Sequence, residues 1–244
     1  MRPFVLLATR AEDLPADDEY AAILRGSGLD ERELIRVRLE AGPMPPLDLD
    51  SLSGIIVGGG PFNASDPATT KSDVQCRVES EFARLLDEVV PRDFPFLGAC
   101  YGIGTLGVHQ GAVVDRTFGE PISVVPVTLT DDGARDPLFA GLPPDFGAFV
   151  GHKEAVSVLP PHAVRLASSP RCPVQAFRVG RNVYATQFHP ELDVEGITTR
   201  IHAYAGHGYF GPDELDATLA AVRRAPVSHP SRLLRTFVEL YARN

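Results

Sequence analysis

The stretch FLGACYGIGTLG (Phe96–Gly107) places one cysteine, Cys100, between two glycines at the end of an apolar run. Its centre has the form G-x-C-x-G, directly after an expected buried strand and before an expected helix. This is the nucleophile-elbow arrangement with Cys in place of Ser, in which glycines permit a tight turn and the helix N-terminus favours a thiolate. A free cysteine is more often a small buried hydrophobe, so the elbow alone makes Cys100 only a candidate nucleophile.

Around this elbow, short β-type runs alternate with helical patterns. Strands are expected at Pro3–Ala8, Glu33–Leu39, Ser53–Gly59 and Phe94–Ala99, and helices at Asp17–Gly26 and Ser72–Val90. The order strand, helix, strand predicts an α/β fold with a mostly parallel sheet flanked by helices on both faces. The second helix should pack on the sheet through apolar residues spaced by three and four positions: Val74, Val78, Phe82, Leu85, Leu86 and Val89.

The second half of the chain changes pattern. Short β-type segments at Ile122–Leu129, Gly147–His152 and Asn182–Phe188 predict a small antiparallel or mixed extension of the sheet. The final section is expected to be helical, with Pro212-Asp213-Glu214 opening one helix and Ser231–Asn244 forming the amphipathic last one. We expect a single domain over residues 1–244, with a core of roughly 1–195 and a C-terminal helical section over 196–244.

Composition narrows the class of protein. The formal net charge is −9 and the 23 Lys and Arg residues are scattered, which argues against a nucleic-acid partner. No apolar stretch is long enough to span a bilayer, so we expect a cytoplasmic protein with no membrane association. Three widely spaced cysteines suit neither a disulfide framework nor a paired-cysteine zinc site, and we expect no metal. Cys76 and Cys172 have no base or motif beside them and are expected to be structural.

A base for Cys100 is available 89 positions further on, in QFHPE (Gln187–Glu191). Proline between them restrains the backbone, so His189 and Glu191 can both project from a strand end, with the carboxylate orienting the imidazole. A second strand runs into the glycine loop Gly58-Gly59-Gly60-Pro61, whose backbone N–H can face a developing oxyanion together with the N–H of Tyr101. The loop lacks the Lys and Ser or Thr of a phosphate-binding loop, which excludes a nucleoside triphosphatase of that type.

Together these motifs resemble the class I glutamine amidotransferase family, most closely the free-standing relatives of the glutaminase domain of GMP synthetase. The Gly-Gly-Pro loop, the PFLGACYG elbow and QFHPE stand in the family's order and at its approximate spacing. Intermediate stretches are also similar: DPLFAGLP (Asp136–Pro143), GHKEAV (Gly151–Val156) and LASSPRCPVQAFRVG (Leu166–Gly180). The likeness covers roughly residues 50 to 195.

The resemblance implies a flavodoxin-like core and a triad that cleaves glutamine or another γ-glutamyl amide or peptide through a thioester, releasing ammonia or an amine. Cys100 would be the nucleophile, His189 the base and then the acid, and Glu191 the orienting carboxylate. The N–H groups of Gly60 and Tyr101 would form the oxyanion hole. The resemblance also suggests substrate contacts for Gly59 and His152, and it implies no metal or organic cofactor.

One position departs from the family. The family usually continues the elbow as C-x-G-x-Q, and that glutamine helps to hold the substrate, whereas this chain has Gly104. Glycine cannot supply a side-chain amide, so recognition of free glutamine is expected to differ, unless the change is drift compensated elsewhere. Three functions stay open: a glutaminase that feeds ammonia to a separate synthetase subunit, a stand-alone γ-glutamyl peptidase, and an inactive binding protein on the same fold. We expect no ATP-pyrophosphatase domain within this length.

The segment IHAYAGHGYF (Ile201–Phe210) contains two histidines, His202 and His207. They are five positions apart and would not share one helical face, as ligands at i and i+4 would. We expect this segment, including Tyr204 and Tyr209, to be a helix end that runs into a turn.

Overall fold

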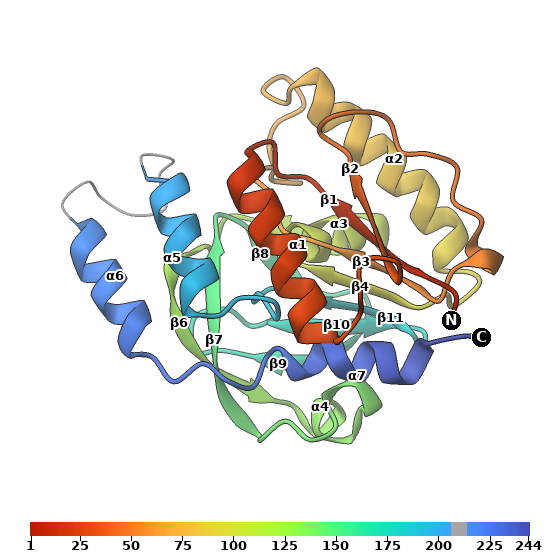
Figure 1. Cartoon of the computed structure of the whole chain (residues 1–244). Helices are drawn as coiled ribbons and strands as arrows, with labels where there is room; N and C mark the ends of the chain where they lie inside the picture. The colour runs from red at the N-terminus through yellow and green to blue at the C-terminus, as the bar shows by residue number, and fades with distance from the viewer. Residues whose placement is uncertain (206–213) are drawn as a thin grey trace.

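The computed structural model of the chain describes residues 1–205 and 214–244 (Figure 1). Its strands are β1 Phe4–Ala8, β2 Leu34–Arg38, β3 Gly54–Val57, β4 Phe96–Ala99, β5 Val113–Asp115, β6 Glu120–Leu129, β7 Asp145–His152, β8 Ala155–Val158, β9 Val164–Ser168, β10 Ala176–Val179 and β11 Val183–Thr186. Its α-helices are α1 Asp13–Ser27, α2 Asp73–Val89, α3 Tyr101–His109, α4 Asp131–Arg135, α5 Val194–Ala203, α6 Leu215–Arg224 and α7 Arg232–Tyr241. Two 3₁₀ turns lie at Leu49–Ser51 and Pro137–Phe139.

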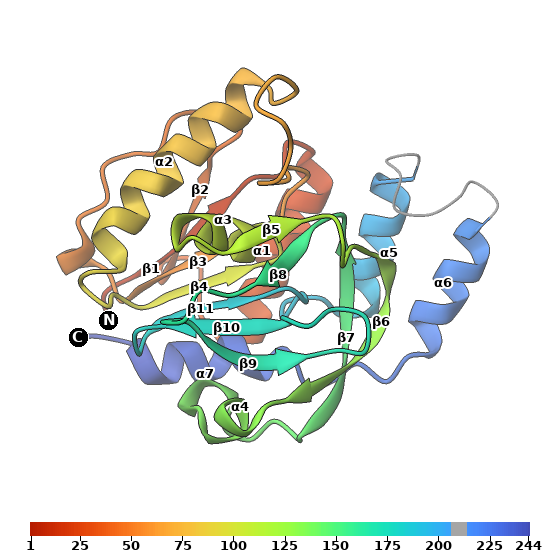
Figure 2. The same cartoon turned by 180° about the vertical axis from the view of Figure 1, so that it is seen from behind.

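The main sheet joins a parallel half to an antiparallel half. Its strand order is β2-β1-β3-β4-β11-β10-β9-β6-β7. The pairs from β2 to β11 are parallel, whereas every pair from β11 to β7 is antiparallel. A separate two-stranded sheet, β5 with β8, lies beside α3 (Figure 2). The expected α/β fold with a mostly parallel core and an antiparallel extension is confirmed.

Strands β1, β3, β4 and β11 of the parallel half are buried on both faces, as their continuous apolar sequences predict, whereas the edge strand β2 is partly exposed. In β1, Phe4 and Leu6 belong to the core shared with α1 and α7, whereas Val5 and Leu7 belong to the core shared with α2 and α3. Figure 1 shows α1 and α7 on one face of the sheet, and Figure 2 shows α2 and α3 on the other. Alternate side chains of one strand therefore hold two layers of helices.

Helix α2 lies where the sequence places it, with one correction. Val78, Phe82, Leu85, Leu86 and Val89 are buried, but Val74 is 37% exposed. Val74 has the right angular position, but it lies in the first turn of α2, which projects beyond the strand ends in Figure 1. Helical periodicity predicts which side a residue faces and not how far the partner surface extends along the helix axis.

The C-terminal helices pack in two places. Apolar residues of α5 and α6 form a separate core with Ile122 and Phe149 of β6 and β7. In α7, Phe237 packs on Phe4 of β1 with ring centroids 5.9 Å apart. The chain ends also meet, because Arg2 N donates to Arg243 O at 2.7 Å.

Some expectations for this section reach beyond the described residues. Helix α5 ends at Ala203 and Tyr204 begins a turn, as expected, but His207 and Tyr209 lie outside the described residues. Pro212 and Asp213 also lie outside them, and α6 begins directly after Glu214. Among the described residues, no helix is both long and apolar enough to cross a bilayer.

Candidate active site

Cys100 occupies a sharp turn between β4 and α3. Its φ of 53° and ψ of −93° lie in a region that non-glycine residues rarely adopt. The turn is tight because a Cβ at Gly98 would lie 2.9 Å from the backbone carbonyl of Gly102, so only glycine fits there. Cys100 N donates to Thr186 O at 2.8 Å, which ties the turn to the end of β11. The structure therefore has the strained elbow that the sequence predicts.

His189 and Glu191 follow the end of β11 and face each other. Their contact joins His189 Nδ1 to Glu191 Oε1 at 2.8 Å, and both side chains are buried. The bend that presents them is held by Thr186 Oγ1, which donates to Phe188 O, and by His189 N, which donates to Phe149 O. The imidazole is thereby oriented by a carboxylate two residues away, as a triad requires.

Gly59 is the point at which the cysteine and the histidine approach. A Cβ at this position would lie 2.7 Å from His189 Cε1 and 3.5 Å from Cys100 Cβ. The Gly59 backbone is engaged within the protein, because its N–H donates to Glu19 Oε1 and its carbonyl accepts from Thr9 Oγ1. Gly59 thus lies closely packed between the two side chains, and the substrate contact expected for it stays a prediction.

Cys100, His189 and Gly60 line one cavity of about 30 Å³, which has room for one or two water molecules. Among the described residues, the backbone N–H groups of Gly60 and Tyr101 donate to no protein acceptor. These are the two donors expected to form an oxyanion hole. The other side of the cavity is covered by α5, through Ile197 and Arg200.

Two buried arginines beside the cavity were missed by the sequence analysis. Arg200 of α5 places Nη1 2.9 Å from His189 Nδ1 and Nη2 2.7 Å from Glu191 Oε1. Arg10, two residues after the end of β1, pairs with the buried Glu19 of α1 at 3.0 Å and donates to Tyr204 Oη at 3.0 Å. Arg200 Nη2 also reaches Glu19, at 3.2 Å.

The sequence carried a signal for part of this network. Arg10 comes two residues after the end of a buried strand, and so lies at the same sheet edge as the elbow. Glu19 interrupts the apolar spacing of Ala16, Ala22 and Ile23 on the buried side of α1. A charged residue on a buried face needs a partner of opposite charge.

Burial and these charges set the protonation states. Burial raises the pKa of the Cys100 thiol to about 12, although Arg10 and Arg200 oppose the rise. Burial lowers the pKa of His189 to about 4, assisted by Arg200 and opposed by Glu191. Burial alone would raise the pKa of Glu191, but His189 and Arg200 hold it below its usual range. These shifts favour a neutral thiol, a neutral imidazole and a carboxylate at neutral pH, whereas the position of Cys100 at a helix N-terminus favours a thiolate.

A side chain at position 104 would require Glu154 to move. A Cβ there would lie 2.8 Å from Glu154 Oε1 and 3.6 Å from Ala64 Cβ. Glu154 Oε1 accepts from Ala64 N at 2.8 Å, and Oε2 accepts from Ser65 N at 2.7 Å. A carboxylate that holds the loop after Pro61 thus fills the space that a longer residue at position 104 would need.

The other candidates lie outside the cavity. His152 uses both ring nitrogens within the protein: Nδ1 lies 2.8 Å from Glu154 O and Nε2 lies 3.1 Å from Glu120 Oε2. Its neighbour Gly151 lines the cavity, and the substrate contact expected for His152 stays a prediction. Cys76 is exposed on α2, whereas Cys172 is buried in the loop before β10.

Comparison with known proteins identifies the family of this chain. The family model described as "Glutamine amidotransferase class-I" matches residues 33–204. The chain belongs to the class I glutamine amidotransferase family. The resemblance noted in the sequence is thus confirmed, and this amidotransferase-family chain has relatives among curated proteins and solved structures.

Among curated relatives, the chain is 32% identical over 163 residues to the glutamine amidotransferase-like protein YfeJ of Salmonella typhimurium, covering 66% of this chain and 65% of that protein. It is 29% identical over 147 residues to one subunit of a glutamine-hydrolyzing GMP synthase of Thermoplasma acidophilum, covering 60% of this chain and 66% of that subunit. It spans only 25% of the length of a GMP synthase of Hamiltonella defensa. The chain thus spans less than two thirds of each of these relatives.

Among solved structures, a glutamine amidotransferase from Thermotoga maritima superposes with a TM-score of 0.77 at 23% identity, and the match covers 100% of both chains. A glutamine amidotransferase from Methylobacillus flagellatus superposes with a TM-score of 0.71 at 18% identity, covering 100% of this chain and 97% of that one. At these identities the likeness establishes the fold.

Proposed function

We propose that this chain is a cysteine hydrolase of the glutaminase type, which cleaves a γ-glutamyl amide and releases ammonia or an amine. The observation that carries the proposal is the meeting of Cys100 and the His189–Glu191 pair at Gly59, on one cavity. A strained cysteine, a buried neutral imidazole and an orienting carboxylate form a set suited to nucleophilic acyl transfer.

In the proposed reaction, Cys100 Sγ attacks the γ-carbonyl carbon while the thiol proton passes to His189 Nε2. The negative charge that develops on the carbonyl oxygen is stabilised by the N–H groups of Gly60 and Tyr101. His189 then donates its proton to the leaving nitrogen, the C–N bond breaks and a γ-glutamyl thioester remains on Cys100. Water attacks this thioester with His189 as base, the C–S bond breaks and glutamate leaves. Each step uses side chains of the protein and water, with no metal or organic cofactor.

Glutamine is the proposed substrate, because the relatives include proteins named as glutamine-hydrolyzing. One of them is named as a subunit of a GMP synthase, so ammonia transfer to a separate synthetase subunit is the proposed use of the product. A free, reactive cysteine is best kept reduced, which supports the proposal of a cytoplasmic location.

A γ-glutamyl peptidase is the second candidate, and Gly104 favours it. The family's glutamine is missing there, and the carboxylate of Glu154 occupies its space. The α-amino and α-carboxyl groups of the γ-glutamyl moiety would then meet a different set of partners.

The test is a steady-state assay of the purified chain with glutamine and with a panel of γ-glutamyl peptides. Cys100→Ser and His189→Ala should abolish turnover while circular dichroism stays native, and Cys76→Ser, at an exposed cysteine, should keep it. Turnover retained in Cys100→Ser contradicts the mechanism. Faster turnover of the peptides than of glutamine supports the peptidase, whereas glutamine turnover only with an added synthetase subunit rules it out. Turnover of none of these substrates supports the inactive binding protein.

A further inference from the structure

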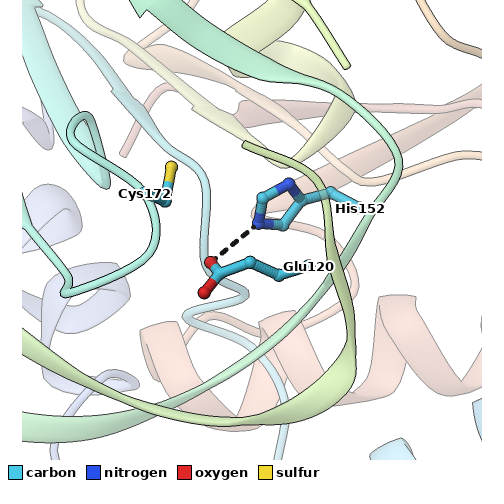
Figure 3. Close-up of side chains that lie close together, drawn as sticks. All are labelled: Glu120, His152 and Cys172. Atoms are coloured by element: carbon cyan, nitrogen blue, oxygen red, sulfur yellow. Dashed lines mark hydrogen bonds and ion pairs between the residues drawn. The ribbon is translucent and has the colours of Figure 1, made fainter. Parts of the chain in front are cut away.

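A second cluster of reactive side chains lies outside the cavity lined by Cys100. Glu120 begins β6, His152 ends β7 and Cys172 lies in the loop between β9 and β10. Glu120 and His152 are opposite each other in the β6–β7 ladder. In Figure 3, Glu120 and His152 face each other and Cys172 lies beside them, and one ligand atom of each residue is within 4.8 Å of the others. All three residues are buried, at 2%, 4% and 0% exposure respectively.

The hydrogen bonds of His152 fix which ring nitrogen carries a proton. Nδ1 lies 2.8 Å from the backbone carbonyl of Glu154, which can only accept, so Nδ1 is the protonated nitrogen of the neutral ring. The lone pair on Nε2 then points at Glu120 Oε2, 3.1 Å away. Two acceptors face each other at this distance only when a proton or a cation lies between them. A histidine whose other N–H donates to a backbone carbonyl is the usual form of a metal ligand.

The cluster also holds buried oxygens without partners. Glu120 Oε1 and Gln175 Oε1 form no hydrogen bond within the described residues. Gln175 Nε2 donates to Glu120 Oε2 at 2.9 Å, which brings the amide to the edge of the cluster. Among the ion pairs of residues 1–205 and 214–244, Glu120 has His152 as its partner and no arginine or lysine. A buried carboxylate in this position needs a compensating charge.

We propose that Glu120, His152 and Cys172 bind a structural zinc ion. Thiolate sulfur, imidazole nitrogen and carboxylate oxygen are all zinc donors, and this mixed set fits zinc better than magnesium or calcium, which prefer oxygen. The cation lies between His152 Nε2 and the Glu120 carboxylate, and Gln175 Oε1 or water completes the tetrahedron. Binding replaces the proton of the Cys172 thiol, which passes to solvent, so the site gains a zinc–sulfur bond as the S–H bond is lost.

Zinc binding needs a small rearrangement of the three side chains. Zinc lies about 2.0–2.3 Å from such donors, which separates neighbouring donors by roughly 3.5 Å. The pair His152 Nε2 and Glu120 Oε2, at 3.1 Å, must open slightly, and the Cys172 thiol must give up its hydrogen bond to Val174 O and move toward the ion. The bound ion joins β6 and β7 to the loop before β10. It also fixes His152, whose ring holds the backbone of Glu154.

The test is the zinc content of the untagged full chain, purified from zinc-supplemented cells without chelator and measured by inductively coupled plasma mass spectrometry. We expect about one zinc per chain in the wild type and in Cys76→Ser, whose cysteine is exposed on α2, and a loss of at least tenfold in Cys172→Ser and Glu120→Gln. Circular dichroism identifies any variant that does not fold.

A second measurement does not depend on the variants. Wild-type protein stripped by a chelator and titrated with Co²⁺ should develop thiolate-to-cobalt charge-transfer absorption and the visible bands of a tetrahedral site. Folded wild type that holds no more zinc than Cys172→Ser, or that shows no cobalt–thiolate absorption, overturns the proposal. In that case Glu120 and His152 form a buried hydrogen-bonded pair beside a thiol.

Discussion

The guanidinium of Arg200 lies 2.9 Å from His189 Nδ1. The same nitrogen lies 2.8 Å from Glu191 Oε1, so a cation and an anion compete for one ring atom. A protonated Nδ1 donates to Glu191 and leaves Nε2 free to take the proton of Cys100, which is the tautomer that the proposed reaction needs. The positive charge of Arg200 disfavours a positive charge on the His189 ring and so lowers its pKa. Together with burial, Arg200 thus favours the neutral imidazole that the proposed reaction needs as its base.

Replacing Arg200 should move the pH profile. In Arg200→Gln, loss of the nearby positive charge raises the pKa of His189, so the base is protonated at higher pH and the acid limb of kcat/KM shifts upward. Because Glu19 and Glu191 lose a buried partner, we expect a destabilisation of about 3–5 kcal/mol, measured by urea unfolding. Arg200→Lys keeps the charge and should retain an acid limb near that of the wild type.

The matched control is Arg25→Gln, which removes an arginine from an exposed pair with Asp193 on the same side of the fold. This variant should leave the pH profile unchanged and should change the free energy of unfolding by no more than about 1 kcal/mol. An acid limb in folded Arg200→Gln that coincides with that of the wild type would show that Arg200 does not act on His189.

The wild-type profile itself should be unusually broad. His189 has a pKa lowered to about 4, so the base is available above that pH, and Cys100, with a pKa raised to about 12, stays a thiol across the neutral range. We expect kcat/KM to rise through about pH 4 and then to stay level, with circular dichroism at each pH to separate titration from acid unfolding. An acid limb near the ordinary histidine value of 6.5 would contradict the buried neutral imidazole.

Thiol labelling should follow exposure rather than catalytic role. With iodoacetamide at neutral pH, we expect Cys76 to react first, because it is exposed, Cys100 to react slowly as a neutral thiol and Cys172 not to react without unfolding. A glutamine analogue that carries an electrophile should reverse the order of the first two, because binding places it against Cys100. Peptide mass mapping measures the labelling order with each reagent. If iodoacetamide labelled Cys100 fastest, Cys100 would be a thiolate in the resting protein.

Gly104→Ala should be costly although alanine favours helices. Its Cβ would meet Glu154 Oε1 at 2.8 Å and displace the carboxylate from Ala64 N and Ser65 N. We expect a loss of about 1–3 kcal/mol in urea unfolding and a higher KM. The double variant Gly104→Ala with Glu154→Ala removes the collision and should recover part of the helix stability. A single variant as stable as the wild type would mean that Glu154 moves aside freely.

The sequence predicts the parallel core and the elbow because their signals are local. The apolar runs of β1 and β4 and the glycines around Cys100 each constrain the backbone where they stand. The motifs alone suggested that Cys100 and His189 act together, and the structure supplies the reason: β4 and β11 are parallel, so their carboxyl ends share one edge of the sheet. The same reasoning placed Gly60 at the correct edge.

What the sequence could not predict depends on contacts across the fold. Arg200 approaches His189 only because α5 packs over β6 and β7, and no local pattern gives that angle. The space at Gly104 is taken by Glu154, a residue 50 positions away. Val74 has the periodicity of a buried residue, and its exposure depends on where the sheet ends.

The most direct measurement of the proposed function is to trap the acyl-enzyme. The full chain is mixed rapidly with a γ-glutamyl substrate, quenched in acid, which preserves thioesters, and analysed by intact and peptide mass spectrometry. We expect a mass gain of one γ-glutamyl group on the peptide that contains Cys100, removed by hydroxylamine and absent in Cys100→Ser. Turnover of the substrate with no acyl group on Cys100, or with the group on another residue, would contradict it.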